Sequence, residues 1–264
     1  MLESRITFVL KLLILLEYVC FGVLGAKGLI LGVRNPASFT TITDIPKDSA
    51  NPFRNATLQL YPSTSQITSL SSDTKKAVVF AAIGETIYIY HNFSIWQNVS
   101  AKFSVQFRGK SAAIGQIAFD FVSNNLYWCD SLLNWIAMKP AYNYNNTFYK
   151  VVVEQDLIQP EGLALDPVDR FMFFSDNNPN SRIEKASLDG QDRVVIVHKG
   201  LSRVLALTVD PDNNKLYWAD FGRQTLEGCD YDGANRRVIR RMNSVSITGL
   251  TYFQDRVLAP DMSE

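Results

Sequence analysis

Residues Lys215-Leu-Tyr-Trp-Ala-Asp220 form an apolar run whose two faces both demand burial. In a β-strand, Leu216 and Trp218 would point to one face and Tyr217 to the other, because successive side chains alternate. All three side chains are large and apolar-bodied, so both faces of this strand need cover. Sheets stacked face to face provide that cover, whereas a strand of a two-sheet sandwich would alternate with polar residues.

The segments on either side of this run predict a unit of four antiparallel strands. A strand over Val204–Asp210 precedes it across the turn Pro211-Asp-Asn-Asn214, which consists of turn-forming residues. A third strand, Thr225–Tyr231, ends at Asp232-Gly233, a strong signal for a two-residue hairpin. A short fourth strand covers Val238–Met242. Four strands in roughly 44 residues are typical of a β-propeller blade.

The same unit recurs along the chain. Each copy ends its second strand on an aspartate, and successive closing aspartates are 46, 44 and 41 residues apart. This spacing predicts an array of blades from about residue 76 onward. The closing motifs are Leu126-Tyr127-Trp128-Cys129-Asp130, Phe173-Phe174-Ser175-Asp176, Leu216-Tyr217-Trp218-Ala219-Asp220 and a degenerate Arg256-Val-Leu-Ala-Pro-Asp261.

The closing aspartates Asp130, Asp176 and Asp220 are expected to be structural. A carboxylate at a strand end can accept backbone N–H bonds from the following turn. Because the aspartates lie in separate blades, we do not expect them to hold a metal, and we expect no cofactor. The chain also lacks nucleophile and phosphate-loop motifs, so the sequence offers no candidate catalytic residue.

These motifs resemble the YWTD repeat of the LDL-receptor class B family. The runs that close at Asp130 and Asp220 match four of the five positions of Leu-Tyr-Trp-Thr-Asp, and Gly162-Leu-Ala-Leu-Asp-Pro167 is also similar to the family. The resemblance covers about residues 76–264. It implies an all-β, six-bladed YWTD-type β-propeller that binds proteins outside the cell and is not an enzyme.

The length of the resemblance predicts an incomplete ring. Residues 76–264 hold about 4.3 repeats of 44 residues. We therefore expect about 4–5 blades, with an apolar face and a strand edge open at each end of the array. Residues 26–75 are rich in Ser, Thr and Pro and weakly patterned, so they are interpreted as a polar, mostly irregular extension in which short strands are the alternative.

The N-terminus predicts secretion. Arg5 and Lys11 flank an apolar stretch, and cleavage after Gly25 satisfies the small-residue rule, so residues 1–25 are interpreted as a signal peptide. An uncleaved anchor helix and a buried core helix are the alternatives. Four N-glycosylation acceptors agree with the secretory route: Asn55, Asn92, Asn98 and Asn145. Among them, we most expect Asn145 to be glycosylated.

Charge and cysteine usage bound the partners. The chain carries 26 Lys+Arg and 26 Asp+Glu, and a nucleic-acid-binding domain usually has a basic excess, so nucleic acid is not expected. After signal cleavage Cys129 and Cys229 would remain, and they either pair or fill buried strand positions as small apolar residues.

Four arginines are expected to form a solvated outer strand and its turn, with a heparan sulfate or other acidic-ligand patch as the alternative: Arg236, Arg237, Arg240 and Arg241.

The resemblance favours an extracellular protein ligand for this chain. The preferred interpretation is a ligand-binding ectodomain fragment of an LDL-receptor-related receptor, of the Wnt co-receptor type, with a membrane tether only if the natural chain continues past Glu264. A secreted matrix protein of nidogen type and a calcium-dependent propeller lactonase are the alternatives. Each interpretation places the protein outside the cell, either secreted or at the plasma membrane, and none identifies the ligand or its contact residues.

Overall fold

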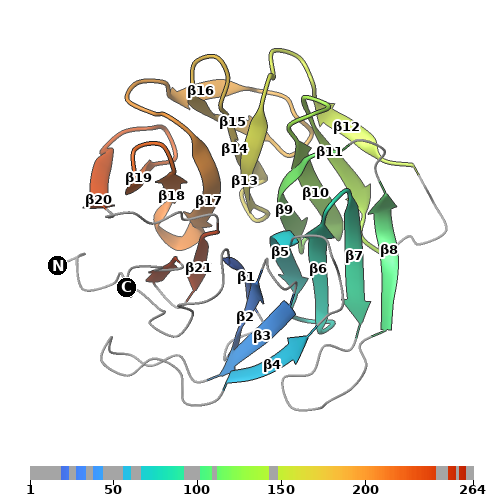
Figure 1. Ribbon diagram of the computed structural model, residues 1–264. Coiled ribbons are helices and arrows are strands. Elements are labelled where there is room, and N and C mark those ends of the chain that lie inside the picture. Colours follow the sequence, from blue (N-terminus) through green and yellow to red (C-terminus); the bar gives the residue numbers. More distant parts are fainter. Residues whose placement is uncertain are drawn as a thin grey trace.

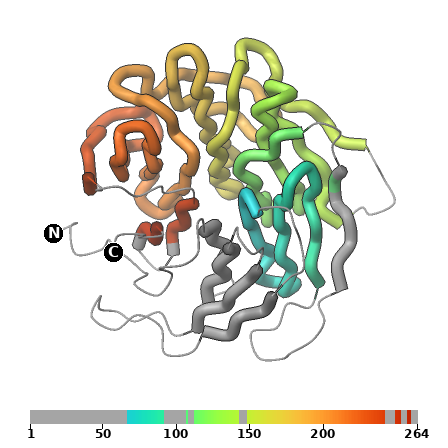
Figure 2. The backbone as a smooth tube through the Cα atoms, in the orientation of Figure 1, coloured from blue at the N-terminus to red at the C-terminus, as the bar shows by residue number. Residues whose placement is uncertain are grey.

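The strands form six antiparallel sheets arranged around a common centre (Figure 1). The computed structural model describes residues 67–91, 112–142, 148–241, 249–253 and 256–259, together with the backbone of five further strands. Among these residues, five sheets have four strands and the sixth has two. The sheets succeed one another around the ring in chain order (Figure 2). The expectation of a β-propeller built from four-stranded blades is confirmed.

Each sheet is called a blade and is numbered by its place in the chain. Blade 1 consists of β1 (Val19–Val23), β2 (Gly28–Val33), β3 (Ser38–Thr43) and β4 (Ala56–Leu60). Blade 2 consists of β5 (Ile67–Asp73), β6 (Val78–Ile83), β7 (Thr86–His91) and β8 (Lys102–Arg108). Blade 3 consists of β9 (Ile114–Asp120), β10 (Asn125–Asp130), β11 (Trp135–Pro140) and β12 (Lys150–Val153).

The second half of the ring repeats this plan. Blade 4 consists of β13 (Pro160–Asp166), β14 (Phe171–Asp176), β15 (Arg182–Ser187) and β16 (Val194–Val197). Blade 5 consists of β17 (Val204–Asp210), β18 (Lys215–Asp220), β19 (Thr225–Asp230) and β20 (Arg237–Arg241), with the short 3-10 helix η3 (Pro211–Asn213) in its first turn. The described part of blade 6 is β21 (Thr251–Phe253) and β22 (Arg256–Leu258).

The first strand of each blade is innermost. The strands β1, β5, β9, β13, β17 and β21 surround the centre of the ring (Figure 1), and each contacts the next. β1 also contacts β21, so the last blade returns to the first. Innermost neighbours run in the same direction, because Ser69 Oγ accepts from the Ile117 N–H and Ser71 Oγ from the Phe119 N–H, both at 3.0 Å. We call the face where these strands begin the top face and the opposite one the bottom face.

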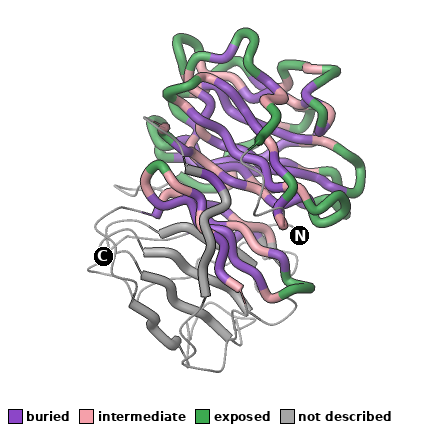
Figure 3. Tube along the Cα trace, turned by 90° about the vertical axis from the view of Figure 1, so that its right-hand side faces the viewer, coloured by how far each residue is buried: buried purple, intermediate pink, exposed green. Residues whose placement is uncertain are grey.

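The two faces of each second strand are buried in different cores. Leu216 and Trp218 pack with residues of blade 4, while Tyr217 packs with residues of blade 6. In the same way Trp128 packs against blade 2 and Tyr127 against blade 4. Buried residues therefore run through the interior of the blades, and exposed residues gather at the turns (Figure 3). This is the two-sided burial that the Leu-Tyr-Trp runs predict.

The closing aspartates tie the top loops together. Asp130 Oδ1 accepts from the backbone N–H groups of Leu132 and Leu133 in the following turn, each at 3.0 Å, and from Ala113 in the loop before the blade at 3.1 Å. Asp220 accepts in the same way from three backbone N–H groups, and Asp176 accepts from two. Each aspartate therefore satisfies backbone donors that a turn would otherwise expose, which is a structural role.

The interpretation of residues 26–75 as mostly irregular is wrong. Strands β2, β3 and β4 lie in this segment, and β5 begins at Ile67. The error has a physical cause: these strands carry no Tyr-Trp motif, and apart from Leu29-Ile30-Leu31 in β2 many of their residues are Ser, Thr or Gly, so they lack the repeated aromatic runs that mark the later blades. The strands missing from the length estimate therefore come from blade 1, residues 19–60, and from β5, residues 67–73.

The signal peptide and the glycosylation sites stay predictions. Residues 1–18 lie outside the described residues, and so do the acceptors Asn55, Asn92, Asn98 and Asn145. β1 lies within the predicted signal peptide, at Val19–Val23. Cleavage after Gly25 would therefore remove the innermost strand of blade 1. The position of cleavage thus decides whether blade 1 keeps β1. Asp261, the fourth closing aspartate, also lies outside the described residues.

Candidate functional site

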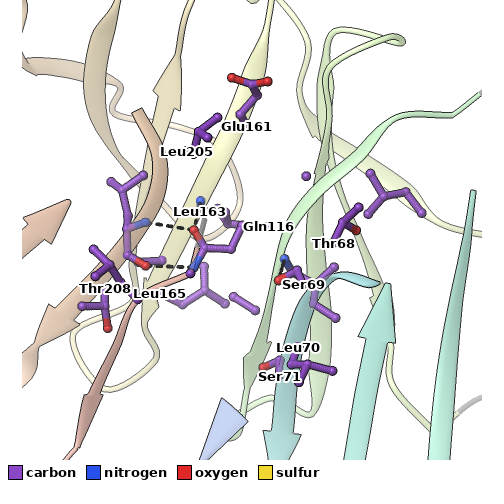
Figure 4. Close-up of a pocket in the computed structure, with 18 of the residues that line it drawn as sticks. Thr68, Ser69, Leu70, Ser71, Gln116, Glu161, Leu163, Leu165, Leu205 and Thr208 are labelled. Carbon is purple, nitrogen blue, oxygen red and sulfur yellow. Dashed lines mark hydrogen bonds between the residues drawn. The ribbon is translucent and has the colours of Figure 1, made fainter. Parts of the chain in front are cut away.

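A cavity of about 770 Å³ occupies the centre of the ring. The innermost strands line it, and much of its wall is backbone with Ser, Thr and Leu side chains (Figure 4). A volume of this size is typical of ligand sites in proteins. Its two mouths differ in chemistry. Glu85, Ser131, Glu161, Arg203 and Phe221 lie at the top mouth, and the bottom mouth is lined by Phe121, Pro167 and Pro211.

The Gln116 side chain crosses the middle of this cavity. It projects from β9, and its Oε1 accepts from the backbone N–H groups of Leu163 on β13 and Leu207 on β17, each at 2.9 Å. Its Nε2 donates to the Leu207 carbonyl at 2.8 Å (Figure 4). One amide therefore joins three blades and narrows the passage between the top and bottom mouths.

The Glu161 carboxylate is fully engaged at the top mouth. It stands near the start of β13, and its side chain is 12% exposed. Arg203 grips it with two N–H groups, Nε to Oε2 at 3.0 Å and Nη2 to Oε1. Asn177 Nδ2 donates to Oε2 at 2.7 Å, and Gln159 Nε2 donates to Oε1 at 3.3 Å. Because four donors use the carboxylate's lone pairs, Glu161 has little capacity for a ligand cation.

Arg203, by contrast, keeps donors for a ligand. Its backbone N–H is fixed by Asp220, and its side chain is fixed by the two bonds to Glu161, which raise the pKa of the guanidinium further. A guanidinium has five N–H donors, and Glu161 takes two of them. The side chain is still 46% exposed. Arg203 is therefore a pre-positioned donor at the cavity mouth.

Exposed apolar side chains lie in the top-face turns and loops of blades 3, 4 and 5, and one of them lines the cavity. Leu132 and Leu133 occupy the turn between β10 and β11, and Ile158 lies in the loop that enters blade 4. Phe221 is in the corresponding turn of blade 5 and lines the cavity. Exposed apolar groups gathered around a concave centre, with an arginine beside them, are the composition of a protein-binding surface. Cavity mouth, Arg203 and these four side chains together are called the top site.

Charge is segregated across the top face. In the described loops of blade 5, residues 198–203 and 221–224, the exposed charged residues are Lys199, Arg203 and Arg223. In the loop 154–159 they are Glu154 and Asp156, and the turn of blade 2 adds the exposed, acidic Glu85. Among the described top-face residues, the exposed charges are basic over blade 5 and acidic over blades 2 and 4. Arg182 and Arg193, which are about one-fifth exposed, donate to the carbonyls of Asp156 and Gln155 within the acidic loop.

The bottom face carries exposed apolar residues of a different kind. Phe121, Val122 and Val168 sit in the first turns of blades 3 and 4. The neighbouring charge is used within the fold, since Arg170 Nη1 pairs with the buried Asp120 at 2.9 Å. Both faces therefore carry a half-exposed arginine that is fixed by a largely buried acid, and the top face differs because its arginine, Arg203, lines the central cavity.

The structure divides the arginine cluster that the sequence singles out. Arg236 is not part of a solvated patch, because it pairs with the buried Glu227 at 2.8 Å and donates to the Lys199 and Gly200 carbonyls. That part of the expectation is corrected. Arg237, Arg240 and Arg241 are exposed on the outermost strand β20.

The other residues named from the sequence are buried within the blades. The motif aromatics and closing aspartates lie in the cores between blades: Tyr127, Trp128, Asp130, Phe173, Phe174, Asp176, Tyr217, Trp218 and Asp220. Cys129 and Cys229 are both free thiols, buried in different cores. In the described part of the chain, no group of three or more His, Cys, Asp or Glu residues could hold a metal ion, and no helix is long and apolar enough to cross a membrane.

Sequence reasoning missed Arg203 and Glu161 as surface residues of the top site. A signal existed: each lies just before or at the start of an innermost strand, and the propeller topology brings all such positions to one mouth. The sequence could not predict the hydrogen bonds between them, because the two residues are 42 positions apart and belong to different blades.

Comparisons with known proteins agree with this architecture. No family model matches the chain. It is similar to the low-density lipoprotein receptor-related protein 5 of Mus musculus (34% identity over 136 residues) and of Homo sapiens (36% over 136 residues). Those alignments cover 51% of this chain and 8% of each receptor-related protein. The protein cueball of Drosophila sechellia is 25% identical over 159 residues, covering 56% of this chain and 25% of that protein.

A solved structure is similar as well. A chain in the crystal structure of a nidogen/laminin complex superimposes with a TM-score of 0.58 and 29% identity, covering 66% of this chain and 65% of that chain. With the sequence relatives, this similarity supports a YWTD-type propeller.

Proposed function

We propose that this chain is an extracellular protein-binding propeller and that its partner docks on the top site. The observation that carries the proposal is that Arg203, held by Glu161, lines the cavity mouth beside the exposed Phe221. The exposed Leu132 and Ile158 lie in the top-face loops of blades 3 and 4. Arginine and large apolar side chains are enriched where binding energy concentrates. The similarity to a receptor-related protein and to a propeller from a nidogen/laminin complex supports an extracellular partner.

The finer assignments belong to the same proposal. A ligand-binding segment of an LDL-receptor-related receptor, of the Wnt co-receptor type, agrees with the relatives at 34% and 36% identity. A nidogen-type matrix protein agrees with the structural similarity. Both place the chain in the secretory pathway, either secreted or at the outer side of the plasma membrane. N-terminal sequencing of secreted material tests the predicted cleavage after Gly25.

A glycan placed on each face in turn tests the docking site. The double change Asp156→Asn and Ile158→Thr creates an N-glycosylation acceptor in the loop that enters blade 4, beside the top mouth. The matched control, Asp189→Asn with Gln191→Thr, creates one at the exposed bottom hairpin of the same blade. Both proteins are secreted from animal cells and tested against an array of secreted and receptor ectodomains. We expect the top glycan to abolish binding that the bottom glycan preserves; the reverse pattern would refute the proposal.

The exposed arginines of β20 support a second candidate. Arg237, Arg240 and Arg241 lie within five residues of an outermost strand, where a polyanion could reach all of them. We propose this strand as the contact for heparan sulfate. Heparin chromatography of the wild type and of a triple arginine-to-glutamine variant tests it, and an unchanged elution salt concentration would exclude it.

A further inference from the structure

We propose that the top site selects a ligand that places a carboxylate on Arg203, over blade 5, so that the acidic end of the ligand lies over blade 5 and any basic end lies over blades 2 to 4. This inference rests on the proposed function, because it names the chemistry of the partner at the same site. The relationship that supports it is the segregation of the exposed charges among the described top-face residues: Lys199, Arg203 and Arg223 on one side, and Glu85, Glu154 and Asp156 on the other.

A ligand at the blade 5 side of the mouth can reach Arg203 but not Glu161. Glu161 is saturated by donors and mostly buried, so it neutralises part of the local charge without offering an acceptor. Arg203 is nearly half exposed, and three of its five donors are not used by Glu161. On the blade 5 side of this mouth the available hydrogen-bonding chemistry is therefore that of a donor, and carboxylate and carbonyl oxygens are its complements.

The Arg203 guanidinium is held in place before a ligand binds. The Arg203 backbone N–H is bound by Asp220 at 3.1 Å, and its carbonyl accepts from the Phe221 N–H at 2.7 Å. The side chain is held by the fork to Glu161. A ligand carboxylate would therefore meet a guanidinium whose rotamer entropy is already lost, which favours a planar, bidentate contact.

Cationic and purely apolar ligands fit this surface less well than an acidic ligand. A cationic ligand group would find Glu161 occupied and Arg203 and Arg223 repelling it. A purely apolar ligand could use Leu132, Ile158 and Phe221, yet it would cover the exposed Arg203 and leave its donors without acceptors, which is costly. A ligand with an acidic group next to apolar side chains satisfies both features of the surface.

A library of disulfide-constrained random peptides displayed on phage is the probe. Selection is made on the full chain, and peptides are kept only if the glycan at position 156 blocks them. We expect the retained peptides to be enriched in Asp or Glu. For a single retained peptide, Arg203→Gln should weaken binding by about tenfold or more, and so should replacing the peptide's acid by its amide. The two changes together should cost little more than either alone.

Controls keep the test decisive. Lys150→Gln removes an exposed cation from β12, the outermost strand of blade 3, and should leave peptide affinity unchanged. Arg223→Gln removes a positive charge from the same sector without touching the Glu161 network. If Arg203→Gln lowers the melting temperature, Arg223→Gln replaces it in the binding measurements. Retained peptides without acids, or additive losses for Arg203→Gln and the amide peptide, would overturn the charge preference while leaving the top site as a docking surface. Failure of the ectodomain array as well would refute the docking surface itself.

Discussion

The Arg236 guanidinium lies 2.8 Å from the Glu227 carboxylate and 5.4 Å from the centre of the Trp218 ring. Blade 4 repeats the arrangement, with Arg193 Nε at 2.9 Å from Glu184 and its guanidinium 5.7 Å from the Phe174 ring. Both arginines also donate to carbonyls of the loop that enters their blade, Arg193 to Gln155 and Arg236 to Lys199 and Gly200. The third strand of a blade, its last turn and its entering loop are thereby joined around one buried glutamate.

Replacement of Arg236 by alanine should strongly destabilise the fold. Glu227 is 2% exposed, and the loss of its main partner would leave a buried carboxylate poorly compensated, at a cost of about 3–5 kcal/mol. Arg237→Ala, one residue away but exposed, should change stability by less than about 0.5 kcal/mol. Urea unfolding of both variants measures the difference. Similar midpoints would show that the Arg236–Glu227 pair contributes nothing to stability.

Truncation of Trp218 to alanine should cost about 3–5 kcal/mol in the free energy of unfolding, through lost burial and the cavity left behind. The side chain is fully buried between blades 4 and 5. Val238→Ala on the exposed side of β20 is the matched control and should cost far less. Thermal melts followed by circular dichroism check this, and a Trp218→Ala protein as stable as the Val238→Ala protein would contradict the packing between blades.

Two glycines with similar backbone conformations should respond differently to alanine. Gly233 (φ +87°) and Gly200 (φ +60°) both adopt left-handed backbone, which costs an alanine about 1–2 kcal/mol. A Cβ on Gly233 would lie 2.2 Å from the Ile196 carbonyl oxygen of blade 4, whereas the nearest atoms at Gly200 are 3.9 Å away. Gly233→Ala should therefore lower stability further, by about 1–3 kcal/mol of overpacking. Equal losses in denaturant unfolding would mean that the hairpin tip does not set the spacing of blades 4 and 5.

The buried thiols should be inert in the folded protein. Burial raises the pKa of Cys229 from 9.0 to about 12 and also raises that of Cys129. Because the thiolate is the reactive form, iodoacetamide at pH 8 should label neither cysteine until urea is added. Mass spectrometry of the peptides that contain each cysteine provides the measurement, and labelling in the native state would show that the cores open.

The same shift predicts loss of stability at alkaline pH. The unfolded thiol releases its proton near pH 9, while the folded Cys229 keeps it to about 12. The contribution is therefore fully present below pH 9 and is lost as the pH rises from 9 to 12. In Cys229→Ala the decline across this window should be shallower than in the wild type, and an unchanged slope would assign the decline to other groups.

The sequence predicts those parts of the fold that depend on residues close together in the chain. Tyr217 and Trp218 indicate burial on both faces of one strand, and Asp232-Gly233 indicates the hairpin that the structure contains. Blade 1 escaped notice because it has no such aromatic motif and a leader-like segment overlaps β1. The role of Arg236 also escaped notice, because its partners Glu227 and Gly200 are fixed by strand register and blade stacking rather than by a nearby pattern.

The Gln116 amide bonds to a residue 91 positions away in the chain. The bond to Leu163 requires blades 3 and 4 and the bonds to Leu207 require blades 3 and 5, so the full set stabilises the assembled blades 3 to 5 rather than any single blade. The Leu163 and Leu207 N–H groups should consequently exchange with solvent hydrogen at the rate at which the three blades separate, slower than the fraying of either blade alone. Gln116 thus makes the centre of the ring, its most hollow part, the place where the unfolding of blades 3, 4 and 5 is coupled.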